Sequence, residues 1–149
     1  MKMPNMTNFF TSWLFWALLS AVFAALTAIF AKVGIDEVNS DFATFFRTIV
    51  ILIILGGILL ATNQFQPLHS ITAKSYLFLC LSGLATGASW VCYFRALKIG
   101  NASQVAPIDK LSVVLVAIFG VVFLSEKLST GNWIGVCLIA VGALLVAMR

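Results

Sequence analysis

Charged side chains are scarce in this sequence of 149 residues. Asp, Glu, Lys and Arg make up 9% of the chain, whereas they make up about a quarter of a typical soluble domain. Hydrophobic residues make up 62%, and the mean hydropathy is +1.09. Because no soluble fold can bury so much apolar surface, the composition excludes a soluble domain and predicts an integral membrane protein.

The residues that usually build catalytic, metal or redox sites are also few. The single His69 lies in a predicted polar loop, and Cys80, Cys92 and Cys137 lie in apolar runs, where we interpret them as small hydrophobic residues. The sequence contains no phosphate-binding loop, no Ser/His or paired-Asp arrangement at membrane depth and no cluster with metal-ligand spacing. We therefore predict no enzyme, no nucleic-acid partner, no cofactor and no metal.

What the sequence does contain is five long apolar runs, each close to the roughly 20 residues that a membrane-spanning helix needs. Membrane strands are excluded because they alternate in polarity, whereas these runs are continuously apolar. The fourth run is the least typical, since Pro107, Asp109 and Lys110 lie near its start. The predicted spans are residues 9–31, 42–62, 75–94, 104–125 and 128–148. The predicted fold is a single all-α domain over residues 1–149, a membrane bundle of five transmembrane helices.

An odd number of spans places the two termini on opposite sides of the membrane. Lys and Arg usually accumulate on the cytoplasmic side, but the loops of this chain are balanced. Their charges are Lys2, Lys74 and Lys127 on the N-terminal side, and Lys32, Lys98 and Arg149 on the other. If the membrane-edge residues Arg47, Arg95 and Lys110 are also counted, the positive charges weakly favour a cytoplasmic C-terminus. We hypothesise that the chain inserts in both orientations and forms an antiparallel homodimer that mimics an inverted repeat.

Small residues recur at helical spacing on two predicted spans. They are Ala17, Ala21, Ala24 and Ala28 in the first span, and Gly83 and Gly87 in the third. Membrane helices associate through such residues because small side chains let two backbones approach. We therefore interpret both groups as helix-packing surfaces rather than as ligand contacts.

A polar stripe runs along the third span beside the glycines. Ser82, Thr86, Ser89 and Tyr93 share one helix face, and Trp90 lies on the glycine side. In one interpretation the hydroxyls bond to carbonyls of their own helix and Tyr93 anchors at the membrane interface. In the other, the stripe and Trp90 line a substrate path. The sequence leaves both interpretations open.

Four charged residues form a second candidate site on one side of the membrane. Arg47, Arg95, Asp109 and Lys110 all lie within or at the edge of predicted spans, where ionisable groups are costly unless they are paired or hydrated. If Pro107 occupies the first helical position, Asp109 lies in the first turn, where the helix dipole favours an acid, and Lys110 extends to the headgroups. We favour this structural interpretation over substrate contact, and expect Arg47 or Arg95 to pair with Asp109.

Several short motifs then suggest a family. They are A-L-K-I-G-N-A-S at residues 96–103, F-L-S-E-K-L at 123–128, N-W-I-G at 132–135 and V-G at 141–142, with looser agreement in A-K-V-G-I at 31–35 and F-F-R at 45–47. In these motifs the chain resembles a single EamA domain of the drug/metabolite transporter superfamily. The A-P-I-D-K segment at residues 106–110 departs from the commoner family forms.

The resemblance implies a multi-pass transporter of the cell (inner or plasma) membrane. Usual members of the superfamily carry two five-helix repeats of opposite orientation and export or exchange small metabolites, amino acids or drugs by alternating access. Because this chain is similar to one repeat only, the resemblance implies pairing with a second copy or with another half-transporter. It also implies a structural role for Glu126 and specifies no substrate. The chain also resembles small multidrug-resistance transporters in being short, but its first span lacks their essential Glu.

Two functions of different classes compete at this point. The first is a secondary transporter of a small molecule, in which Asp109 is the only acidic candidate for proton coupling and Arg47, Arg95 and Lys110 attract an anionic group. The second is a scaffold or accessory subunit of a larger membrane complex. The second function predicts that the polar stripe is buried against a partner and that no cavity is present.

Overall fold

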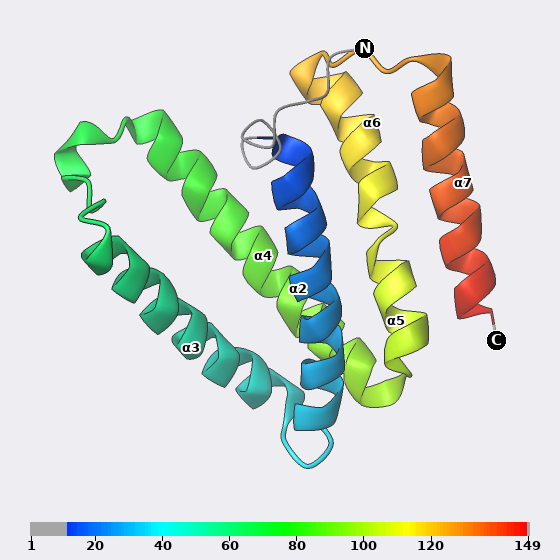
Figure 1. The fold of residues 1–149 in the computed structure, drawn as a ribbon, viewed down its shortest axis with the longest axis horizontal. Helices are drawn as coiled ribbons and strands as arrows, with labels where there is room; N and C mark the ends of the chain where they lie inside the picture. Colours follow the sequence, from blue (N-terminus) through cyan, green and yellow to red (C-terminus); the bar gives the residue numbers. More distant parts are fainter. Residues whose placement is uncertain (1–11, 149) are drawn as a thin grey trace, which may run out of the picture.

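The structure, a computed structural model, describes residues 12–148 of the chain. Five helices are long and apolar enough to cross a membrane, and the described residues contain no strand, which confirms the predicted all-helical fold (Figure 1). They are α2 (Trp13–Gly34), α3 (Ser40–Ala61), α4 (Ala73–Ile99), a fourth span divided into α5 (Ala102–Asp109) and α6 (Ser112–Leu124), and α7 (Thr130–Ala147), with a short 3-10 helix η1 (Leu68–Ser70) between α3 and α4. Lys2, Arg149 and the first three residues of the predicted span 9–31 lie outside the described residues.

Polar residues directly before the apolar runs determine where the helices begin. Asn39 before α3, Thr72 before α4 and Ser129 before α7 each accept a hydrogen bond from a backbone N–H two or three residues further on. These side chains satisfy N–H groups that have no partner within the helix. As a result α3 and α4 begin two residues earlier than predicted. At its other end, α4 continues five residues past the predicted end of its span.

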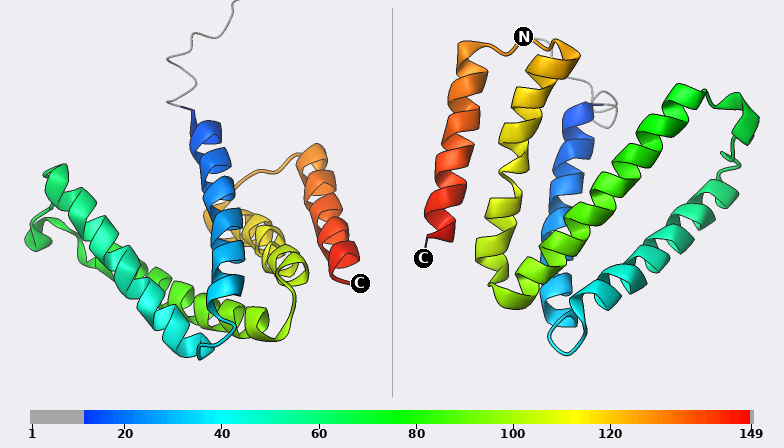
Figure 2. Two further views of the ribbon diagram at one scale, coloured as in Figure 1. Left: turned by 60° about the horizontal axis from the view of Figure 1, so that its bottom comes forward. Right: turned by 180° about the vertical axis from the view of Figure 1, so that it is seen from behind.

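The helices form a bundle that is closely packed at one end and open at the other. α2 contacts α4 and α5, and α7 contacts α5 and α6, whereas α3 and α4 form a hairpin that leans away from α7 (Figures 1 and 2). Most buried side chains gather where α2 and α4 end and α3 begins; they are Ala28, Ile35, Thr44, Phe94 and Leu97. The start of α2 and the end of α7 lie at opposite ends of the bundle, as an odd number of spans requires.

Two lysines join the ends of α2 and α4 to each other. The ammonium group of Lys32, in the last turn of α2, donates to the carbonyl oxygens of Leu97 (2.8 Å) and Gly100 (3.0 Å) at the end of α4. Lys98, in the last turn of α4, donates to the carbonyls of Ile35 and Asp36, both at 2.6 Å, just after α2. The last carbonyls of a helix lack partners within it, and cations are favourable there. We call this arrangement the lysine clasp, and the end of the bundle that holds it the clasp end.

The fourth span is interrupted at Lys110 and Leu111, and so differs from the continuous helix predicted over residues 104–125. The N–H of Leu111 donates to Ile108 and that of Val113 donates to Lys110, both at 3.0 Å, so the chain passes through tight three-residue turns here. Pro107 lies inside α5, where its ring removes one backbone donor. The break falls where the charged residues of this span lie.

The position of Asp109 within α5 corrects a second expectation. α5 begins at Ala102, after Asn101, so Pro107 is not its first residue. Asp109 is therefore the last residue of α5, at the helix end where the dipole disfavours an acid, and the favourable first-turn position expected from the sequence does not occur. The dipole thus gives no structural reason for an acid at this position.

Glu126 takes part in the turn that ends α6. Its N–H donates to the carbonyl of Gly120 (3.1 Å), and Ser125 ends the helix in a left-handed conformation with φ of 56°. The Glu126 carboxylate folds back over α6, so that a Cβ added at Gly120 would lie 2.7 Å from its Oε2. Gly120 thus leaves room for the glutamate at the end of the helix.

Candidate functional site

A cavity of about 200 Å³ brings together most of the polar residues singled out in the sequence. Its lining comes from four helices, α2, α3, α4 and α5, and from the break that follows α5. The lining residues are Ala24, Thr27, Arg47, Ser89, Trp90, Tyr93, Asp109 and Lys110. We call this space the central cavity.

The four helices contribute residues at one common depth. Thr27, Arg47, Tyr93 and Asp109 each lie six or seven residues from the end of their helix at the clasp end. At 1.5 Å per residue this is about 10 Å along each helix from the clasp end. Because the lysine clasp aligns the ends of α2 and α4, it also fixes the level at which their cavity residues meet.

Aromatic rings, rather than an acid, hold Arg47 in this cavity. Its guanidinium carbon lies 4.4 Å from the ring centroid of Trp90 and 5.3 Å from that of Phe94, which are cation–π contacts. Among the described residues, no oxygen accepts a hydrogen bond from its guanidinium. The aromatic rings therefore hold a half-buried cation whose N–H donors remain available in the cavity.

Asp109 pairs with its neighbour Lys110, and the expected pairing with Arg47 or Arg95 is wrong. The ammonium group of Lys110 lies 3.2 Å from Oδ2 of Asp109. Within a helix the two side chains would point about 100° apart, but α5 ends at Asp109 and the flexible lysine folds back across the break. The cavity therefore holds one ion pair and one additional cation.

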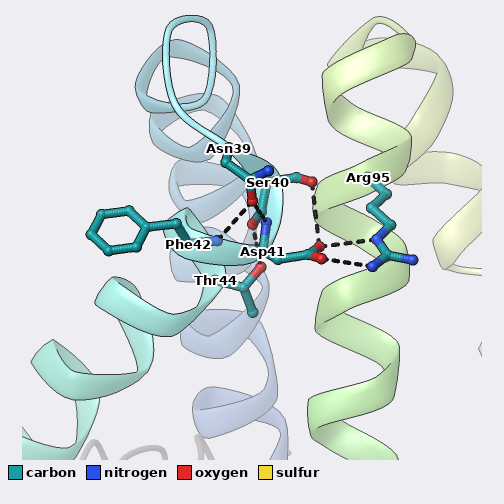
Figure 3. A network of polar contacts seen from close by, with 6 residues as sticks. All are labelled: Asn39, Ser40, Asp41, Phe42, Thr44 and Arg95. Carbon is teal, nitrogen blue, oxygen red and sulfur yellow. Dashed lines mark hydrogen bonds and ion pairs between the residues drawn. The ribbon is translucent and has the colours of Figure 1, made fainter.

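Arg95 lies outside the central cavity because another acid engages it. Its Nε and Nη2 donate to the two carboxylate oxygens of Asp41, at 2.9 and 2.6 Å (Figure 3). Asp41 lies in the first turn of α3, where the helix dipole favours an acid, and Asn39 caps the same turn. The predicted span began at residue 42 and left Asp41 in a loop, so the sequence reading missed this partner.

The polar stripe of α4 divides into two parts. Ser89 and Tyr93 line the central cavity, as the substrate-path interpretation requires, and Trp90 lines it beside them. Thr86, one turn away, instead donates to the carbonyl of Ser82 in its own helix (2.9 Å), and both of these residues are exposed. One half of the stripe therefore lines a cavity and the other half bonds within its own helix, and a substrate path along the stripe stays a prediction.

The two groups of small residues also differ. Ala21, Ala24 and Ala28 line a space of about 320 Å³ opposite residues of α5, and Ala17 does not line it. Of these four alanines only Ala28 is buried. A Cβ at Gly83 or Gly87 would meet no atom within 4 Å, so no other described helix packs against these glycines. Their predicted packing role would require a second molecule.

Two larger grooves adjoin the central cavity. One of about 540 Å³ lies between α2 and α3, and Thr27 and Arg47 belong to both spaces. Another, of about 460 Å³, lies among α4, α5 and α7 and shares Ser89, Tyr93 and Asp109 with the cavity. The sequence reading missed Thr27 and the first groove, although the hydroxyl of Thr27 on an otherwise apolar face was a usable signal.

These spaces combine charged, hydroxyl and apolar side chains. Among residues 12–148, no group of three His, Cys, Asp or Glu side chains is placed to hold a metal ion. The central cavity instead offers a free guanidinium, hydroxyl groups and an ion pair at membrane depth, next to apolar grooves. Charged groups held at this depth usually mark the path of a substrate or an ion.

Comparison with known proteins relates the chain to membrane transporters. Residues 11–148 match the model of the EamA-like transporter family. The chain is 64% identical over 137 residues to a Sinorhizobium sp. protein named "Uncharacterized transporter in cobO 3'region", an alignment that covers 92% of this chain and 97% of that protein. No solved structure matches the chain significantly. These matches confirm the resemblance seen in the motifs and indicate a transporter rather than an enzyme. The chain belongs to the EamA-like transporter family.

Proposed function

We propose that the protein is a secondary transporter that exports or exchanges a small metabolite or drug by alternating access. The observation that carries this proposal is the central cavity, where four helices hold Arg47, Asp109 and Lys110 about 10 Å inside the span. A membrane protein retains such charges at depth when a substrate or ion uses them. The energy comes from an ion gradient or from exchange, since the sequence has no nucleotide-binding motif.

The working unit in this proposal is an antiparallel homodimer in the cell membrane. Five spans make one repeat, and a second copy of opposite orientation supplies the other. The exposed glycines Gly83 and Gly87, with the exposed Ser82 and Thr86 beside them, offer a surface for that copy on α4. A different half-transporter is the other possible partner.

The cavity favours transport over a purely structural role. A scaffold subunit predicts that the polar stripe is buried against a partner with no space beside it. Ser89 and Tyr93 line a cavity instead, and Arg47 points unused donors into it.

Efflux from liposomes tests the proposal. The purified full-length protein is reconstituted in liposomes loaded with a water-soluble cell extract, and solutes that leave are identified by mass spectrometry. A limited set of solutes is expected to leave faster than from protein-free liposomes, and Arg47→Met is expected to abolish the difference. Lys74→Met, at the start of α4 and away from the cavity, is the matched control and retains efflux. Equal efflux with and without protein, with and without a pH gradient, would overturn the proposal.

A further inference from the structure

We infer that the substrate site takes an amphipathic organic anion, with its carboxylate at Arg47 and its apolar body in the groove between α2 and α3. This inference rests on the proposed transport function and names the substrate class of the same site. It depends on three features of the structure: the unused donors of Arg47, the charge balance of the central cavity, and the aromatic lining of the adjoining groove.

Arg47 is prepared for a planar anion. Trp90 and Phe94 contact its guanidinium through their rings and leave the N–H donors without an acceptor among the described residues. A guanidinium presents these donors in a fork that matches the two oxygens of a carboxylate. Thr27, in the lining of both the cavity and the groove, supplies a hydroxyl at the same place.

The charge balance of the cavity favours an anion over a cation. Its charged lining residues are Arg47, Lys110 and Asp109, which gives one excess positive charge. The one acid is already paired with Lys110 at 3.2 Å, whereas Arg47 has no counter-ion within residues 12–148. A cationic ligand would have to displace Lys110 and approach Arg47, and both steps are unfavourable at low dielectric.

The groove accounts for the apolar body of the ligand. Its volume of about 540 Å³ lies within the range of sites for small organic ligands. Four phenylalanines, Phe30, Phe42, Phe46 and Phe94, line it, and Arg47 is its charged residue. A ligand with its carboxylate on Arg47 can therefore place a ring or chain among these side chains, whereas an inorganic anion would leave the groove unused.

The inference is tested by binding to the full-length protein in nanodiscs, with Trp90 fluorescence as the readout. The sequence has four tryptophans, so Trp13, Trp16 and Trp133 are first replaced by Phe. The probes are 4-phenylbutyrate, the neutral 4-phenylbutanol, the cationic 4-phenylbutylamine, and butyrate, which lacks the ring. We expect 4-phenylbutyrate to bind at least about tenfold more tightly than each of the other three, since a charge-assisted pair and a ring contact are each worth this much.

Two variants test separately the contact of the carboxylate with Arg47 and the contact of the ring with the groove. Arg47→Met is expected to remove the preference for 4-phenylbutyrate over 4-phenylbutanol, and Phe46→Ala is expected to weaken 4-phenylbutyrate while leaving butyrate unchanged. Lys74→Met, a basic residue outside both spaces, leaves all affinities as they were. The comparison of the four probes requires no substitution near the site. It therefore tests the anion preference even if Arg47→Met or Phe46→Ala fails to fold.

An amphipathic carboxylate can reach the site from water or from the bilayer, and competition experiments distinguish these two sources. If oleate competes with 4-phenylbutyrate in zwitterionic nanodiscs, a lipid-derived carboxylate can occupy the site. If only short water-soluble carboxylates compete, the source is the aqueous phase. Both outcomes support an anion site.

Equal binding of 4-phenylbutanol and 4-phenylbutyrate, or tighter binding of the amine, would overturn the inference. That result leaves the transport proposal intact if the liposomes release neutral or cationic solutes. Conversely, an absence of protein-dependent efflux defeats the transport proposal whichever probe binds.

Discussion

At the residue scale, the most informative side chain is Arg47, which has no counter-ion in the part of the chain that the structure describes. Arg95 and Arg47 both lie on the clasp side, but Asp41 engages Arg95, whereas two aromatic rings hold Arg47. The sequence could identify both arginines as costly in a membrane, but it could not assign their partners. Those partners come from other helices, and Asp41 lies in the first turn of α3 because this helix begins two residues before the predicted span.

Asp109 gives the first prediction at this scale. It is the one acid in the lining of the central cavity, and it lies at a helix end where the dipole does not stabilise it. We expect an imposed pH gradient to accelerate efflux from liposomes containing the wild-type protein, and we expect Asp109→Asn to lose this acceleration while retaining exchange. Asp36→Asn, in the loop after α2, is the control and keeps the pH response. A normal pH response of Asp109→Asn would remove proton coupling from this residue.

At the scale of helices, the sequence predicted the presence of the five spanning helices better than the break within the fourth. Long apolar runs specify a spanning helix almost by themselves, since every backbone group must be satisfied within the segment. The break after Asp109 could not be predicted in the same way. Pro107 indicates a disturbance, but whether the chain kinks or breaks depends on the neighbouring helices. Likewise, Lys32 and Lys98 were counted as loop charges, and their backbone partners lie more than sixty positions away.

The lysine clasp leads to a prediction about helix ends. Replacing Lys32 or Lys98 with Met leaves carbonyls at the end of the partner helix without a donor. Because hydrogen bonds to charged groups contribute about 1.5–3 kcal/mol, we expect each variant to lower the Tm of the protein in detergent by several degrees. Lys74→Met, near the start of α4, has no such contact and is the control. A Tm equal to that of the wild type for both clasp variants would show that the clasp does not stabilise the fold.

At the scale of the whole molecule, one chain leaves much of its helical surface exposed. Large apolar residues face outwards along every span, as lipid contact requires, but Ser82, Thr86 and the two glycines beside them do not suit lipid. The α3–α4 hairpin leans away from α7, and the grooves beside the central cavity remain open (Figure 2). These features are consistent with half of a larger unit, and sequence composition alone could not specify where its other half binds.

Two oppositely inserted copies can be detected most directly by cysteine labelling in cells. Cys80, Cys92 and Cys137 are first replaced by Ala, and single cysteines are introduced as Gln66→Cys between α3 and α4, or as Glu37→Cys at the clasp end. A membrane-impermeant maleimide is then added to intact spheroplasts. If the chain forms an antiparallel homodimer, each position is labelled in about half of the molecules, because each copy presents the opposite end. Complete labelling of one position with complete protection of the other would contradict it.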